Sequence, residues 1–262
     1  MRSTRGGGNR LSSCRKDFTL DIYRCAFTLA EVLITLGIIG VVAAMTMPVL
    51  IQNNQERVAV TQLKKSYTVF SQAFLMAVEA NGSAEDWDIG TEDTSIGAQK
   101  LYNIMKPYLL KVKDCNTNRG CFYDGTYKSL NGPSFAWQPS SHSVYARGML
   151  ADGTAFAFWS AGSGCEFDSS KDGKGPLSRV CGSIYVDING YKKPNRAGVD
   201  YFGFMVTKDG IYPSGLPGTI SKYGSKCIYN DTTNTNGVSC TAWVITNENM
   251  DYLKRDISLE WK

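Results

Sequence analysis

Residues 26–55 read AFTLAEVLITLGIIGVVAAMTMPVLIQNNQ, and this stretch decides the fold of the N-terminal part of the chain. It contains no charged residue from Val32 to Gln55 and is almost entirely apolar from Val32 to Ile51. Twenty residues of α-helix extend about 30 Å, which is the hydrocarbon thickness of a lipid bilayer. The stretch therefore predicts a helix that is long enough to span a membrane.

The net positive charge of the chain lies before this helix. Residues 1–26 hold six Lys or Arg against two Asp, whereas the rest of the chain carries equal numbers of basic and acidic residues. Basic residues beside a membrane helix favour the cytoplasmic side, so we expect residues 1–26 in the cytoplasm and the C-terminal part outside it. The balanced charge of that part indicates no nucleic-acid binding.

A secretory signal peptide is an alternative interpretation of the same stretch. Its apolar core would run from Val32 to Val42, and cleavage near Ala43 and Ala44 would release a soluble protein. Glu31 argues against this alternative, because a carboxylate at the mouth of an apolar run costs about 2–3 kcal/mol on insertion unless it has a partner. Glu31 is therefore a candidate functional residue.

The segment around Glu31 strongly resembles the prepilin N-terminal cleavage and methylation segment of type IV pilins and type II secretion pseudopilins. The resemblance covers residues 26–48 closely and is looser beyond them. It rests on a small residue before Phe27, an acid as the fifth residue from Phe27, small residues within the apolar run, and a proline: Ala26, Glu31, Gly40, Ala43, Ala44 and Pro48. The family usually has Gly where this chain has Ala26.

This resemblance implies how the chain is processed and assembled. A prepilin peptidase would cut between Ala26 and Phe27 and methylate the new Phe27 amine. The processed chain would then join other pilin-like subunits on an inner-membrane assembly platform. Glu31 would pair with the terminal ammonium of a neighbouring subunit, so that neither charge stays alone in an apolar filament core. Pro48, which lacks a backbone donor, should kink or locally unwind the helix.

Beyond the apolar stretch the pattern predicts an α+β domain. Apolar residues recur at spacings of three and four on a continuing helix that Asn81-Gly82 ends, namely Val60, Leu63, Tyr67, Phe70, Phe74 and Ala77. A second helix is expected over 97–110, limited by Pro107. Alternating patterns predict strands at 144–150, 155–159, 184–188, 201–207, 211–212 and 242–246. We expect a pilin-like fold, with the long helix packed on an antiparallel sheet.

Six of the eight cysteines lie in the predicted exported part of the chain. They form three couples that are close in sequence: Cys115 and Cys121, Cys165 and Cys181, and Cys227 and Cys240. An oxidising compartment favours disulfides, and closing short loops costs the least entropy. Six cysteines allow 15 connectivities, of which local pairing is our prediction. The spacing fits no zinc site, since there is no CxxC pair and only one histidine.

Few other residues are candidates for metal binding or catalysis. Asp187, Asn189 and Asp200 could supply hard oxygen ligands to calcium, as a loop near this position does in some pseudopilins, although turn-forming residues that bond to their own backbone are the favoured interpretation. We expect no cofactor other than this weak calcium candidate. Nothing resembles a catalytic nucleophile with its base or a carboxylate pair in a pocket, so no enzymatic activity is predicted.

The sequence therefore predicts three parts: a cytoplasmic leader (1–26) that is removed, a transmembrane and assembly half of the helix (27–51), and an extracytoplasmic globular domain (52–262). We expect a single-pass protein of the bacterial inner membrane that enters a type II secretion pseudopilus or a type IV pilus. Its size suggests a minor or accessory subunit. The alternatives are a minor pilin for DNA uptake or adhesion, and a soluble secreted disulfide-rich protein.

Overall fold

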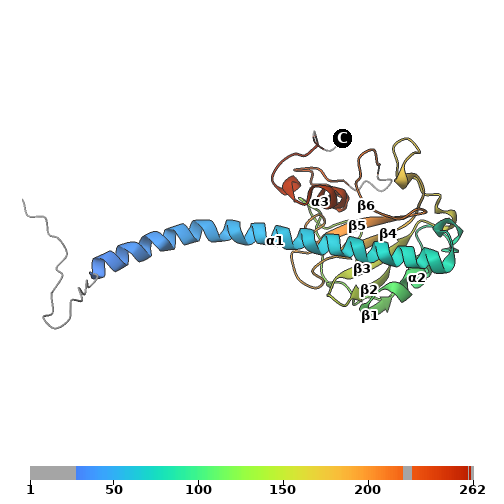
Figure 1. The fold of residues 1–262 in the computed structure, drawn as a ribbon, viewed down its shortest axis with the longest axis horizontal. Coiled ribbons are helices and arrows are strands. Elements are labelled where there is room, and N and C mark those ends of the chain that lie inside the picture. Colours follow the sequence, from blue (N-terminus) through green and yellow to red (C-terminus); the bar gives the residue numbers. More distant parts are fainter. Residues whose placement is uncertain (1–27, 221–225, 259, 261–262) are drawn as a thin grey trace, which may run out of the picture. The chain divides into compact units, whose positions relative to one another are not determined.

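The computed structural model describes residues 28–220, 226–258 and 260. Within them lie three α-helices, α1 (Leu29–Asn81), α2 (Ser95–Met105) and α3 (Thr241–Asn247). A six-stranded sheet is formed by β1 (Lys111–Asn116), β2 (Ala146–Leu150), β3 (Ala155–Ser160), β4 (Val180–Asp187), β5 (Tyr201–Thr207) and β6 (Ile211–Pro213) (Figure 1). The chain divides into two compact units, Met1–Asn54 and Gln55–Lys262.

The sheet is an antiparallel meander in which neighbouring strands follow one another in the chain, from β1 at one edge to β6 at the other. Asp152-Gly153 forms the turn between β2 and β3. Gly153 has a φ of +90°, which favours glycine, and the Asp152 carboxylate accepts a bond from the Thr154 amide at 3.0 Å. The expected α+β architecture is confirmed.

The second half of α1 covers one face of this sheet (Figure 1). Phe70 is fully buried and meets Phe156 and Phe158 of β3 edge to face, with ring centroids 5.6 and 6.2 Å apart. Tyr67 lies 5.7 Å from Phe204 of β5. The predicted apolar stripe is therefore the face of α1 that packs on the sheet, and the helix ends at Asn81 as expected.

The opposite face of the sheet is covered by the long connection 117–145 between β1 and β2. Its aromatic residues pack on Tyr201, with Tyr127 at 5.3 Å and Phe135 at 5.6 Å between ring centroids. Gln138 holds the connection together by accepting a bond from the Tyr127 amide at 2.8 Å and donating to the Tyr127 carbonyl at 2.9 Å. This second core was not predicted from the sequence.

Two elements differ from the sequence prediction. Residues 242–246 were predicted as a strand and instead lie in α3, because a short apolar run does not distinguish a strand from a buried helix. Thr241 anchors the start of this helix, since its hydroxyl accepts a bond from the Gly203 amide of β5 at 3.0 Å. Strand β1 was not predicted, because its charged sequence KVKDCN is that of an exposed sheet edge.

Candidate assembly site at the start of the N-terminal helix

The first turn of α1 is closed by a reciprocal pair of hydrogen bonds between Thr28 and Glu31. The Thr28 hydroxyl accepts a bond from the Glu31 amide at 3.2 Å, and the Glu31 carboxylate accepts from the Thr28 amide at 2.8 Å and from its hydroxyl at 2.9 Å. This is a capping box, which satisfies donors that the first turn leaves unpaired. The capping role of Thr28 was not predicted, although the pattern Thr-x-x-Glu before an apolar run is its signal.

The apolar helix behind Glu31 has the composition of a membrane span. Helix α1 is the one helix among the described residues that is long and apolar enough to cross a membrane, with a mean hydropathy of 2.3 over its most apolar window. Its large side chains in this half are exposed, for example Leu33, Ile38 and Met45 at 61, 61 and 73%. So much exposed apolar surface in water is unfavourable, and a membrane or a bundle of like helices would cover it.

Two glycines and one proline interrupt this surface. A Cβ added at Gly37 or at Gly40 would meet no atom within 4 Å, so neither glycine is required by the packing of the chain itself. Helix α1 stays helical through Pro48, so the local unwinding predicted there is not present, and a kink remains a prediction. The predicted cleavage site, Ala26 and Phe27, lies outside the described residues.

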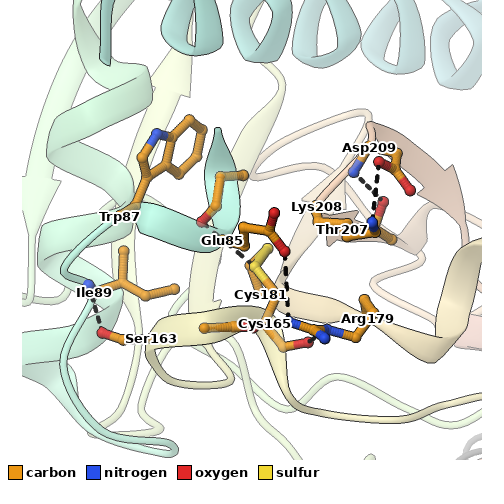
Figure 2. The surroundings of a disulfide bond; sticks show 12 residues. Glu85, Trp87, Ile89, Ser163, Cys165, Arg179, Cys181, Thr207, Lys208 and Asp209 are labelled. Atoms are coloured by element: carbon orange, nitrogen blue, oxygen red, sulfur yellow. Dashed lines mark hydrogen bonds and ion pairs between the residues drawn. A yellow bond between two sulfur atoms is a disulfide. The ribbon is translucent and has the colours of Figure 1, made fainter. Parts of the chain in front are cut away.

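The six cysteines expected in disulfides are joined in the three local pairs, Cys115 with Cys121, Cys165 with Cys181, and Cys227 with Cys240. The second pair ties a short turn to β4 (Figure 2). Beside it, the Arg179 guanidinium donates to the Cys165 carbonyl at 3.2 Å and lies 3.5 Å from the Glu85 carboxylate. The disulfide thus ties the turn at Cys165 to β4, and the Arg179–Glu85 ion pair links the segment after α1 to the same place.

The calcium candidates Asp187, Asn189 and Asp200 lie close together where the connection between β4 and β5 begins and ends, and the two carboxylates are already hydrogen bonded. Asp187 accepts bonds from the Tyr127 hydroxyl at 2.5 Å and the Asn189 amide at 3.2 Å. Asp200 accepts from the backbone amides of Asn195 and Arg196 at 2.7 and 2.6 Å. Burial and the neighbouring Asp200 carboxylate raise the pKa of Asp187, and burial also raises the pKa of Asp200.

This arrangement favours the turn interpretation of the three residues. Asn189 directs its amide nitrogen, not its oxygen, toward Asp200 at 3.1 Å. Within the described residues, no group of three or more His, Cys, Asp or Glu side chains could hold a metal ion.

The N-terminal part of the chain matches a known family motif. Residues 23–47 match the prokaryotic N-terminal methylation motif. The match supports a type IV pilin-like, prepilin-type protein. It spans the expected cleavage point, the capping box and the apolar helix as far as Met47. The capping box and the exposed apolar surface are thus features of a pilin-like N-terminus.

A second match covers the part of the chain that follows the methylation motif. Residues 49–127 match a family of unknown function, DUF6613, and this range takes in the rest of α1, α2 and β1. No curated protein and no solved structure matches the chain.

Proposed function

We propose that the protein is a membrane-anchored subunit of a type II secretion pseudopilus or a type IV pilus, in a minor or accessory role. The observation that carries the proposal is the methylation motif over residues 23–47, which leads into an apolar helix with one acid, Glu31, at its start. The accessory role rests on size, because the 236 residues that follow Ala26 exceed a typical major subunit.

Charge and burial explain why the acid would matter in a filament. Cleavage after Ala26 creates an ammonium group on Phe27, and bundling the apolar helices brings that group into a medium of low dielectric. An unpaired charge is costly there, whereas Glu31 of a neighbouring subunit can compensate it. The pairing would set the axial offset between subunits. In this proposal the chain is a structural subunit of the filament.

In this proposal residues 1–26 are a cytoplasmic leader, 27–51 cross the inner membrane, and 52–262 lie outside it. The proposed site residues are Ala26 and Phe27 for cleavage, Phe27 for methylation, Glu31 for assembly and Pro48 for a helix kink. The partners are a prepilin peptidase, other pilin-like subunits and the inner-membrane assembly platform.

Intact-protein mass spectrometry of membrane fractions tests the proposal. We expect a chain that begins at Phe27 and carries one added methyl group. A chain that begins near Ala44 or Met45 in the soluble fraction would instead establish release by a signal peptidase. A prepilin-peptidase knockout is the control, in which the full leader should remain.

A further inference from the structure

A small pocket opens on the face of the sheet opposite to the one that Phe70 covers. It measures about 80 Å³. Its walls come from the connection 117–145, from β3 and β4, and from the turn before α2. Its polar and aromatic lining residues are Asp93, Trp137, His142, Tyr145, Trp159 and Tyr185.

Aromatic rings form most of the pocket. Tyr145 lies 5.2 Å from the His142 ring and 5.6 Å from the Tyr185 ring, measured between centroids. Trp159 and Tyr185 belong to the neighbouring strands β3 and β4, and Trp137 lies on the connection that covers them. The π face of an aromatic ring is negative and attracts cations.

Asp93 is the one charged residue among the lining residues. Its backbone adopts a φ of +58° and donates a hydrogen bond to the Ser160 carbonyl at 3.1 Å. One carboxylate oxygen accepts a bond from the Trp159 indole at 2.8 Å. Within residues 28–220, 226–258 and 260, no ion pair joins Asp93 to a basic side chain, so its charge is available to a ligand.

The wall that the connection contributes is held in place by a buried arginine. Arg147 is 1% exposed, and its guanidinium donates to the carbonyls of Pro139 at 2.6 Å, Tyr145 at 3.1 Å and His142. These hydrogen bonds hold the segment that carries His142 and Tyr145 in place. Because this wall is already held in place, a ligand would not have to order it on binding, and the lower entropy cost favours affinity.

The positive charge of Arg147 also affects which ligands the pocket attracts. Its guanidinium carbon lies 5.5 Å from the Tyr145 ring centroid, so the rings by themselves would attract a cation weakly. The Asp93 carboxylate supplies the negative charge inside the pocket. Three more acids, Glu92, Glu166 and Asp168, line a neighbouring hollow with Phe167, whose ring lies 5.6 Å from Trp159. Four acids therefore lie in or beside the pocket, Asp93 among them.

We propose that this pocket binds an organic ammonium group. Aromatic rings around a single carboxylate are the chemistry that recognises such cations, and His142 has a buried Nδ1 without a hydrogen-bond partner among the described residues. The volume suits one head group, since pockets for whole small molecules measure about 300–1,000 Å³. The ammonium group could belong to a free quaternary amine or to a lysine side chain of a partner protein.

Saturation-transfer difference NMR on the full chain in a non-ionic polyoxyethylene detergent tests the proposal. The probes are choline, N-acetyl-lysine methylamide, D-glucose, and 3,3-dimethylbutan-1-ol, which is the neutral analogue of choline. We expect saturable binding of choline, of the lysine derivative or of both, and the preferred probe indicates the source of the group. Equal binding of the neutral alcohol, binding of D-glucose alone, or no binding of either ammonium probe would overturn it.

Asp93→Asn is the decisive variant. Asparagine tolerates a positive φ and its carbonyl can still accept the Trp159 bond, so the pocket should keep its shape while losing its charge. We expect affinity for the ammonium probe to fall by about tenfold. Asp172→Asn, which removes an exposed acid outside the pocket, should leave the affinity unchanged. Equal affinity of the Asp93→Asn variant and the wild type would contradict the proposal.

Discussion

At the scale of single residues, Glu31 has two separable roles. Its carboxylate closes the capping box with Thr28, and in the proposed filament its charge pairs with a neighbouring Phe27 ammonium. A glutamine can take the first role but not the second, because the capping box accepts either residue at this position. Substitutions therefore distinguish helix capping from charge pairing.

We expect both Glu31→Ala and Glu31→Gln to reduce incorporation into filaments sharply, because each leaves the neighbouring ammonium unpaired at a cost of about 3–5 kcal/mol. Thr28→Val removes the cap hydroxyl and keeps the charge, so it should assemble nearly as well as the wild type. The measurement is co-purification with sheared filaments, normalised to processed protein in the membrane. Normal assembly of the Glu31→Gln variant would exclude charge pairing as the mechanism.

Asp187 predicts a specific dependence of stability on pH. Its pKa is raised by burial and by the Asp200 carboxylate, so the folded state binds more protons than the unfolded state above the ordinary aspartate pKa of about 3.9. The free energy of unfolding should therefore decrease as the pH rises from about 4 towards neutrality. Thermal melts should show a flatter profile for Asp187→Asn, whereas exposed Asp209→Asn should keep the wild-type slope. Parallel profiles for all three proteins would contradict this account.

At the scale of elements, α1 packs on β3 of the sheet through Phe70. Phe70 is fully buried between Phe156 and Phe158. Phe70→Ala should lower the free energy of unfolding by about 3–5 kcal/mol, because it leaves a cavity. The matched control is Leu75→Ala on the same helix, where the side chain is 64% exposed and the change should stay within about 0.5 kcal/mol. Denaturant titration measures both, and equal losses would show that this face is not the core.

The disulfide between Cys227 and Cys240 closes a loop over a sequence separation of 13. Replacing both cysteines by serine should lower the free energy of unfolding by about 2–3 kcal/mol, because the unfolded chain gains freedom. Non-reducing peptide mapping of the wild type should recover the three local pairs, and crossed pairs would contradict the assignment.

At the scale of the whole molecule, the two compact units predict that the second folds without the first. The large apolar residues up to Ile51 are exposed, whereas the buried ones begin at Val60. A chain that starts at Gln55 should therefore be soluble, monomeric and cooperatively folded, with the melting temperature of the full chain in detergent. Size-exclusion chromatography and calorimetry test this expectation, and aggregation or a non-cooperative melt would contradict it.

Periodic and local patterns could be predicted from the sequence. The apolar run from Val32, the stripe through Phe70, the Asp152-Gly153 turn and the local cysteine pairs depend on residues that are close in sequence, and α1, the β2–β3 hairpin and the disulfides follow from them. The motif around Glu31 is also local. Such features are encoded by the preference of each segment for one conformation.

The tertiary structure alone decided the rest. Residues 242–246 have a strand-like composition, yet they form α3, because Thr241 is anchored on β5 and Trp243 enters the first core. The pocket of Asp93, Trp137 and Tyr185 joins side chains from three distant segments. The sequence by itself determined the membrane-length helix, its charged start and the α+β class, because these follow from local composition. Packing decided α3, the second core and the pocket, because contacts between distant residues outweigh weak local preferences.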